Sequence, residues 1–270
     1  AATRLRLIRA SPDTTGRSNT GTRESRANSW IDGPITLPRT KARHTQGAKE
    51  PMNFSGWQPV SLVDYPKAIS TVLFTSKCNF NCAYCHNPSL KIEQPAIHTE
   101  KAIFEYLERR REQIDALVVS GGEPSLYAGE IIDFSHRLKK RFPNIRLKVD
   151  TNGSNPLFLQ EGREVFGFIA MDVKSLHYEP FSSISFDTIL KSLDILPLYD
   201  HHEARITVYP PYLPESDFET LGRLLKEKRI QNVAIQQYRS VDDIPPYPPE
   251  TLHAFADTLR ALGLNVALRI

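Results

Sequence analysis

The sequence predicts an α/β fold, a partial barrel of six βα units that follows a disordered N-terminal extension. Two observations support this prediction. From residue 53 onward, short apolar runs alternate with stretches of helical periodicity, which is the pattern of repeated βα units around a parallel sheet. Before that point the chain has no such periodicity and is rich in Arg, Ser, Thr and Gly.

The N-terminal segment differs from the rest in charge as well as in pattern. Residues 1–51 contain ten Lys/Arg and four Asp/Glu of the chain's 34 and 31, which leaves 24 and 27 for the remainder. We therefore predict a disordered basic extension at residues 1–52 and one folded domain at 53–270. Three origins of the extension remain open: translation upstream of a true start at Met52, an organelle-type transit peptide, or a functional basic arm.

Six apolar runs are predicted to form the strands. They lie at residues 69–75, 116–120, 145–150, 168–172, 204–209 and 233–237. Helices are expected to follow them at residues 99–113, 129–141, 156–164, 186–196, 215–228 and 249–262. Units of this kind, with all strands parallel, assemble into a partial (β/α)6 TIM-like barrel, whose site lies at the carboxyl ends of the strands.

Local signals set several boundaries. Thr99 is a suitable N-cap for the first helix, where apolar residues recur at helical spacing. Residues 56–70 are predicted to form a leading hairpin. Gly263 is expected to end the last helix before a closing strand at residues 264–268.

Composition argues against two classes of partner. The chain has no run of about 18 apolar residues and no compact apolar signal segment, so we expect a soluble, cytoplasmic protein with no membrane partner. The domain predicted at residues 53–270 is close to charge balance, which gives no electrostatic reason to expect nucleic-acid binding.

All three cysteines lie within eight residues, as Cys78, Cys82 and Cys85. An odd number at CxxxCxxC spacing does not suit a disulfide framework and indicates metal ligation. Three thiolates can hold three irons of a cubane and leave the fourth iron open to an exchangeable ligand. The alternative is a Cys3His zinc site, although adjacent Cys85 and His86 would reach one tetrahedral ion together only with difficulty.

Polar groups also follow the next strands. The second strand runs into Gly121-Gly122-Glu123, where two glycines let a backbone approach a ligand closely and the glutamate offers a carboxylate. The third and fourth strands end in Asp150 and Asp172, which could equally be helix N-caps or turn formers.

Arg205 is a charge on an otherwise apolar strand, so it needs a partner, and a structural salt bridge is the alternative to ligand binding. Because the carboxyl ends of parallel strands form one rim, we expect Arg205 to converge with the cysteines and the other polar groups although they are spread along the chain.

The CxxxCxxC spacing with an aromatic residue, Tyr84, before the last cysteine resembles the radical S-adenosylmethionine (SAM) superfamily. The resemblance implies a [4Fe–4S] cluster on the three cysteines, with SAM chelating the open iron. It also implies that Tyr84 packs near adenine and that Gly121, Gly122 and Glu123 bind the SAM amino group. Packing on the barrel rim is the alternative for Tyr84.

Within that superfamily, the chain resembles the glycyl-radical-enzyme activases, in particular the activating protein of anaerobic ribonucleoside-triphosphate reductase. The shared pieces are a lead-in at residues 56–66, the Cys-His-Asn-Pro sequence at 85–88, DTNG at 150–153 and DVK at 172–174. The family usually has glycine at two positions that are Lys67 and Lys77 here. Lys77 is therefore expected to place a cation beside the cluster or to contact a partner.

The same resemblance implies roles for four charged residues. Asp150 and Asp172 would help to hold a monovalent cation beside SAM, Lys174 would pair with the SAM carboxylate, and Arg205 would also serve SAM. The paired His201-His202 are interpreted instead as the start of a strand or a surface feature.

The implied reaction begins with one electron from a flavodoxin or ferredoxin. SAM is then cleaved to methionine and a 5′-deoxyadenosyl radical, which takes hydrogen from a glycine of the partner, a glycyl-radical enzyme. One alternative is a radical SAM enzyme that acts on a small molecule, similar to 7-carboxy-7-deazaguanine synthase. A non-catalytic iron–sulfur carrier or a nucleic-acid-binding protein is a further alternative.

Overall fold

The computed structural model describes residues 50–239 and 243–270. The predicted extension at residues 1–52 therefore lies outside the described residues up to residue 49. Met52 is described and buried. Its N–H donates to Glu100 Oε2 at 3.1 Å, so this residue belongs to the folded part of the chain.

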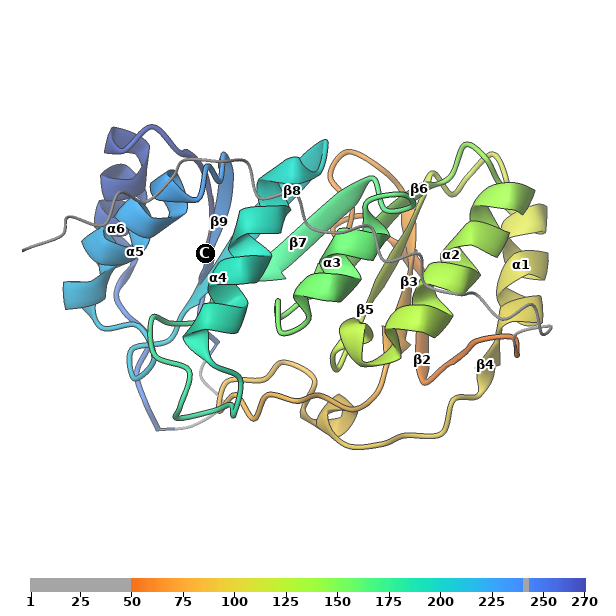
Figure 1. The fold of residues 1–270 in the computed structure, drawn as a ribbon, viewed down its shortest axis with the longest axis horizontal. Coiled ribbons are helices and arrows are strands. Elements are labelled where there is room, and N and C mark those ends of the chain that lie inside the picture. Colours follow the sequence, from red (N-terminus) through yellow and green to blue (C-terminus); the bar gives the residue numbers. More distant parts are fainter. Residues whose placement is uncertain (1–49, 240–242) are drawn as a thin grey trace, which may run out of the picture. The chain divides into compact units, whose positions relative to one another are not determined.

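One sheet of eight strands organises the described residues, with the order β10-β9-β8-β7-β6-β5-β3-β2 (Figure 1). The strands are β2 (Gly56–Ser61), β3 (Ser70–Thr75), β5 (Ala116–Gly121), β6 (Arg146–Thr151), β7 (Phe168–Asp172), β8 (His201–Val208), β9 (Asn232–Gln237) and β10 (Asn265–Arg269). Neighbouring strands are parallel except for β2 and β3, which form the predicted leading hairpin. Because β2 and β10 end the order without pairing to each other, the barrel is partial, as predicted.

Helices follow the strands in chain order along the sheet (Figure 1). They are α1 (Glu100–Arg109), α2 (Ala128–Arg141), α3 (Pro156–Gly162), α4 (Phe186–Ile195), α5 (Phe218–Glu227) and α6 (Pro249–Ala261). Four 3-10 turns accompany them in the described part, at Pro88–Lys91, Pro124–Tyr127, Leu196–Leu198 and Glu215–Asp217. Two short strands, β1 (Asn53–Phe54) and β4 (His98–Thr99), pair antiparallel beside the sheet, and the sequence did not predict them.

Several predicted boundaries are confirmed. Thr99 caps α1, since its hydroxyl accepts from the N–H of Ala102 at 3.2 Å. Gly263 follows α6 with φ of +89°, a conformation that favours glycine. The helix α1 ends at Arg109, before the predicted end at residue 113. Residues 110–114 form a turn with its own hydrogen bonds instead. The strand β8 begins at His201, so the two histidines do start a strand.

The loop at residues 62–69 closes the inner face of the barrel at the end opposite the carboxyl ends of the strands, which we call the floor. Tyr65 from this loop packs edge-on against Phe168, with ring centroids 5.7 Å apart, and joins a small buried cluster with Val72 and Val118. The larger core lies on the helix side of the sheet. None of the described helices is long and apolar enough to cross a membrane.

Both lysines that stand at family glycine positions adopt the left-handed backbone conformation, with φ of +55° for Lys67 and +62° for Lys77. An L-residue in that region costs roughly 1–2 kcal/mol relative to the right-handed one, which is why glycine is expected there. The ammonium of Lys77 lies on the surface, 3.0 Å from Glu93 Oε2.

Candidate functional site

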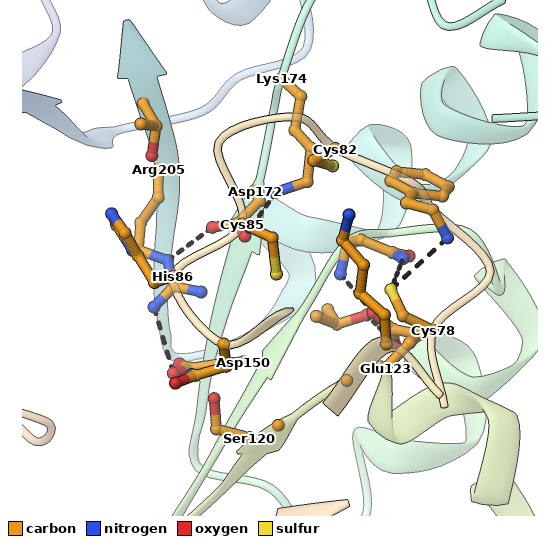
Figure 2. A pocket seen from close by; sticks show the side chains of 18 of the residues that line it. Cys78, Cys82, Cys85, His86, Ser120, Glu123, Asp150, Asp172, Lys174 and Arg205 are labelled. Atoms are coloured by element: carbon orange, nitrogen blue, oxygen red, sulfur yellow. Dashed lines mark hydrogen bonds and ion pairs between the residues drawn. The ribbon is translucent and has the colours of Figure 1, made fainter. Parts of the chain in front are cut away.

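One pocket, at the carboxyl ends of the strands, gathers all the residues that the sequence predicted for the site (Figure 2). These residues are Cys78, Cys82, Tyr84, Cys85, Gly121, Gly122, Glu123, Asp150, Asp172, Lys174 and Arg205. They come from the loop after β3 and from β5, β6, β7 and β8 or the segments just beyond them. The predicted convergence on one rim is therefore what the structure shows.

The cysteine loop follows β3 directly and brings three free thiols to the pocket. Figure 2 shows the three side chains on the loop that borders the pocket. The sulfur of Cys78 accepts from the N–H of Phe80 at 3.4 Å and faces Asn152 Nδ2 at 3.9 Å. Burial raises the pKa of the Cys78 thiol to about 11. A metal ion that bound this sulfur would displace its proton.

The two glycines at the end of β5, Gly121 in the strand and Gly122 just after it, allow β3 and the cysteine loop to approach this strand closely. The N–H of Gly122 donates to Thr75 O at 2.9 Å, and the N–H of Glu123 donates to Lys77 O at 2.8 Å. A Cβ on Gly122 would stand 2.0 Å from Lys77 O, and one on Gly121 would stand 2.2 Å from Thr75 O. The sequence predicts that these glycines let a ligand approach, whereas in the structure they first admit the chain's own backbone.

Glu123 is buried and ties β5 to the end of β6. Its Oε1 accepts from the Thr151 hydroxyl at 2.7 Å and the Ser125 N–H at 3.0 Å, and its Oε2 accepts from the Asn152 N–H at 2.7 Å. Burial raises the pKa of this carboxyl, and these hydrogen bonds oppose the rise. The carboxylate is therefore fixed in orientation by the protein itself, and its contact with the SAM amino group stays a prediction.

A buried chain of five alternating charges crosses three neighbouring strands of the rim. Lys148 Nζ lies 2.9 Å from Asp150 Oδ1, and Asp150 Oδ2 lies 3.1 Å from Arg205 Nη1. Arg205 Nε donates to Asp172 Oδ1 at 2.8 Å, and Lys174 Nζ donates to Asp172 Oδ2 at 2.9 Å. Arg205 thus has the salt-bridge partners that a buried charge requires, and the chain ends on an ammonium at the pocket.

Neighbouring charges keep the two acids of this charge chain ionised although both are buried. For Asp172, burial would raise the pKa, but Arg205 and Lys174 lower it to about 2. The pKa of Asp150 is likewise lowered, by Arg205 and Lys148 against the effect of burial. The guanidinium of Arg205 already bridges Asp150 and Asp172. The binding of a monovalent cation at these acids stays a prediction.

Tyr84 belongs to a cluster of tyrosines at the rim. Its ring centroid lies 5.1 Å from that of Tyr209 and 5.6 Å from that of Tyr212, and Lys174 Nζ lies 5.7 Å from its centroid. The ring is buried and its hydroxyl has no hydrogen-bond partner among the described residues. Packing on the rim, the alternative for this residue, is therefore observed, and contact with adenine stays a prediction.

Two further residues, Asn152 and Lys148, support the site and were not predicted from the sequence. Asn152 bonds Glu123 through its N–H and Asn79 Oδ1 through its side chain at 2.9 Å, beside the sulfur of Cys78. Lys148 pairs with Asp150 from the same strand. The alternation of a strand places residues 148 and 150 on one face, which was the available signal.

The donor set fits an iron–sulfur cluster that binds a further ligand. Three thiols, one with two N–H groups near its sulfur, are the ligands that such clusters use, and hydrogen bonds to the sulfurs tune them.

Comparison with known proteins agrees with this site. The model of the family described as "Radical SAM superfamily" matches residues 72–226, more than half of the chain. A protein of Methanocaldococcus jannaschii named "Putative glycyl-radical enzyme activating enzyme MJ1227" is 32% identical over 200 residues, which are 70% of this chain and 80% of that protein.

Solved structures show the same fold at low sequence identity. A radical SAM methyltransferase from Sphaerobacter thermophilus has a TM-score of 0.61 and 16% identity, over 76% of this chain and 67% of that one. The SuiB protein of Streptococcus suis, bound to S-adenosylmethionine, has a TM-score of 0.56 and 14% identity, over 72% of this chain and 48% of that one. With the cysteine loop and the family match, this likeness leads to one conclusion: the chain is an enzyme of the radical SAM superfamily, which uses a [4Fe–4S] cluster and SAM.

Proposed function

We propose that this enzyme installs a glycyl radical on a partner protein, and that the partner is an anaerobic ribonucleoside-triphosphate reductase. The observation that carries the proposal is the 32% identity to a protein named as a glycyl-radical enzyme activating enzyme. The partial barrel supports it, because a barrel that does not close leaves a side on which a protein loop can enter. A cytoplasmic location and a flavodoxin or ferredoxin as electron donor belong to the same proposal.

Each residue of the pocket has a place in the proposal. Cys78, Cys82 and Cys85 would hold the cluster. When bound, the cluster with SAM on its open iron supplies the 5′-deoxyadenosyl radical that takes a hydrogen atom from a glycine α-carbon. The residues of the chain itself bind and orient SAM and exclude water.

The contacts with SAM follow from charge. Glu123 would accept from the amino group of SAM together with backbone of Gly121 and Gly122. Lys174, at the end of the charge chain, would pair with the carboxylate. Tyr84 would lie beside the adenine, and a monovalent cation near the acids of the chain is part of the same arrangement.

The test is transfer of isotope from the partner. The enzyme, reconstituted and reduced without oxygen, is mixed with SAM and with an anaerobic ribonucleotide reductase whose glycine residues carry deuterium at the α-carbon. We expect deuterium in 5′-deoxyadenosine by mass spectrometry and a glycyl-radical signal in the partner by electron paramagnetic resonance (EPR). A variant of the partner with alanine in place of the radical glycine is the control.

Two results would contradict the proposal in different ways. Formation of a glycyl radical on another enzyme, and not on the reductase, would keep the activity and change the partner. No transfer from any glycyl-radical enzyme, with 5′-deoxyadenosine labelled instead from a small molecule, would support the 7-carboxy-7-deazaguanine synthase-like alternative.

A further inference from the structure

The loop that closes the barrel floor is fixed by its own hydrogen bonds. The hydroxyl oxygen of Ser61 accepts from the N–H groups of Val63 and Asp64 at 3.2 and 3.3 Å. The ring of Tyr65 is buried against Phe168. The carbonyl oxygen of Asp64 is thereby held at one place inside the barrel, at the floor, which lies below the strand ends that form the pocket.

Lys148 connects this floor to the pocket. Its Nζ donates to Asp64 O at 2.6 Å and lies 2.9 Å from Asp150 Oδ1, and its side chain is only 7% exposed. The ammonium also lies 5.4 Å from the centroid of the Phe168 ring. A buried ammonium is stable only with such partners, so its position is set by the floor on one side and by the acid on the other.

The charge chain carries one positive charge more than negative. Lys148, Arg205 and Lys174 are the cations, and Asp150 and Asp172 are the anions. Because Asp64 meets Lys148 with a neutral carbonyl, the floor does not balance this excess. Without Lys148 the charge chain would contain two positive and two negative charges.

We propose that Lys148 is a positioning residue for SAM. It orients Asp150, and through it Arg205, and it supplies the positive charge that leaves the pocket able to bind the SAM carboxylate. The lead-in sequence at residues 61–66 acts on the pocket through this lysine. The inference rests on SAM binding in this pocket and does not depend on the identity of the partner enzyme.

The test compares Lys148→Met, which keeps the length of the side chain and removes the charge, with the wild type after reconstitution of the cluster. The dissociation constant for SAM is measured by equilibrium dialysis, with no partner present. We expect binding to weaken about tenfold, less than the effect of a unit charge in direct contact, because Asp150, Arg205 and Asp172 lie between Lys148 and Lys174. Iron content and the EPR spectrum without SAM should not change.

Lys139→Met is the matched control. Lys139 also donates to a backbone carbonyl, Ile145 O at 2.6 Å, but unlike Lys148 it is not one of the five charges of the charge chain. Its loss should lower thermal stability and leave SAM binding unchanged. A Lys148→Met enzyme that binds SAM as tightly as the wild type would overturn the proposal, whatever its stability.

A double variant separates the charge effect from damage to the fold. Lys148→Met with Asp150→Asn restores an excess of one positive charge, so it should bind SAM more tightly than Lys148→Met alone. If Lys148→Met alone does not fold, the double variant is compared with Asp150→Asn. The charge chain of Asp150→Asn has two excess positive charges, so this variant should bind SAM more tightly than the double variant. Equal affinities in either comparison would overturn the proposal.

Discussion

Alanine at Cys78, Cys82 or Cys85 is expected to lower the rate of 5′-deoxyadenosine formation more than about 100-fold. Even the loss of groups that only orient a metal ligand costs 10–100-fold, and each cysteine here would be a direct ligand. The chain has three cysteines and no spare thiol to replace one. Iron content after anaerobic reconstitution should fall well below the roughly four irons per chain of an intact cluster.

Asn81→Ala is the control for this prediction, because Asn81 lies on the same loop and its side chain bonds Lys91 rather than a thiol. It should keep the iron and the visible absorption of the cluster. A single-cysteine variant that retained four irons and cleaved SAM at the wild-type rate would show that the three thiols do not hold the cluster.

Arg205→Met is expected to lower the free energy of unfolding by about 3–5 kcal/mol, because it leaves buried carboxylates without their shared cation. Arg205 joins Asp150 to Asp172, at 3.1 and 2.8 Å, and its side chain is 15% exposed. This loss is a large part of the stability of an ordinary domain. Urea unfolding of the cluster-free protein, followed by circular dichroism, measures it.

Arg223→Met provides the comparison for an exposed ion pair. Arg223 pairs with Glu219 one helical turn away on α5 and is 68% exposed, so its loss should cost no more than about 0.5 kcal/mol. A loss below about 1 kcal/mol for Arg205→Met would show that the buried chain of charges does not hold the rim together.

The same charge chain makes the stability of the wild type depend on pH. The pKa of Asp172 lies near 2 in the folded protein, below its ordinary value of 3.8, because Arg205 and Lys174 outweigh the opposing effect of burial. A carboxyl group whose pKa is lowered by folding stabilises the folded state at pH values above its ordinary pKa. This contribution is lost as the pH falls from about 4 toward 2. Removal of Arg205 should remove much of this part of the pH profile.

The order of strands and helices could be predicted because each βα unit carries its own apolar pattern. The short pair of β1 and β4 could not, because two-residue strands leave no periodicity to detect. The backbone at Lys67 and Lys77 is a harder case. Lysine disfavours positive φ, so the residues themselves do not indicate this conformation.

The site could be predicted as a set of residues, but their partners could not. That Arg205 needs a partner follows from a charge on an apolar strand, yet the two acids that supply it lie on other strands. Glu123 bonds residues more than 25 positions away, so the sequence suggested only a free carboxylate for a ligand. Lys148 was overlooked because a lysine in a strand usually faces solvent, and only the floor loop reveals its burial.

The central claim is that the pocket holds a cluster on three cysteines with SAM at its open iron. Its most direct test adds SAM to the reduced, reconstituted wild-type enzyme without any partner. We predict that SAM changes the EPR spectrum of the cluster and that 5′-deoxyadenosine and methionine form slowly in equal amounts. The claim would be contradicted if the EPR spectrum of the complete cluster did not change on addition of SAM and no 5′-deoxyadenosine formed.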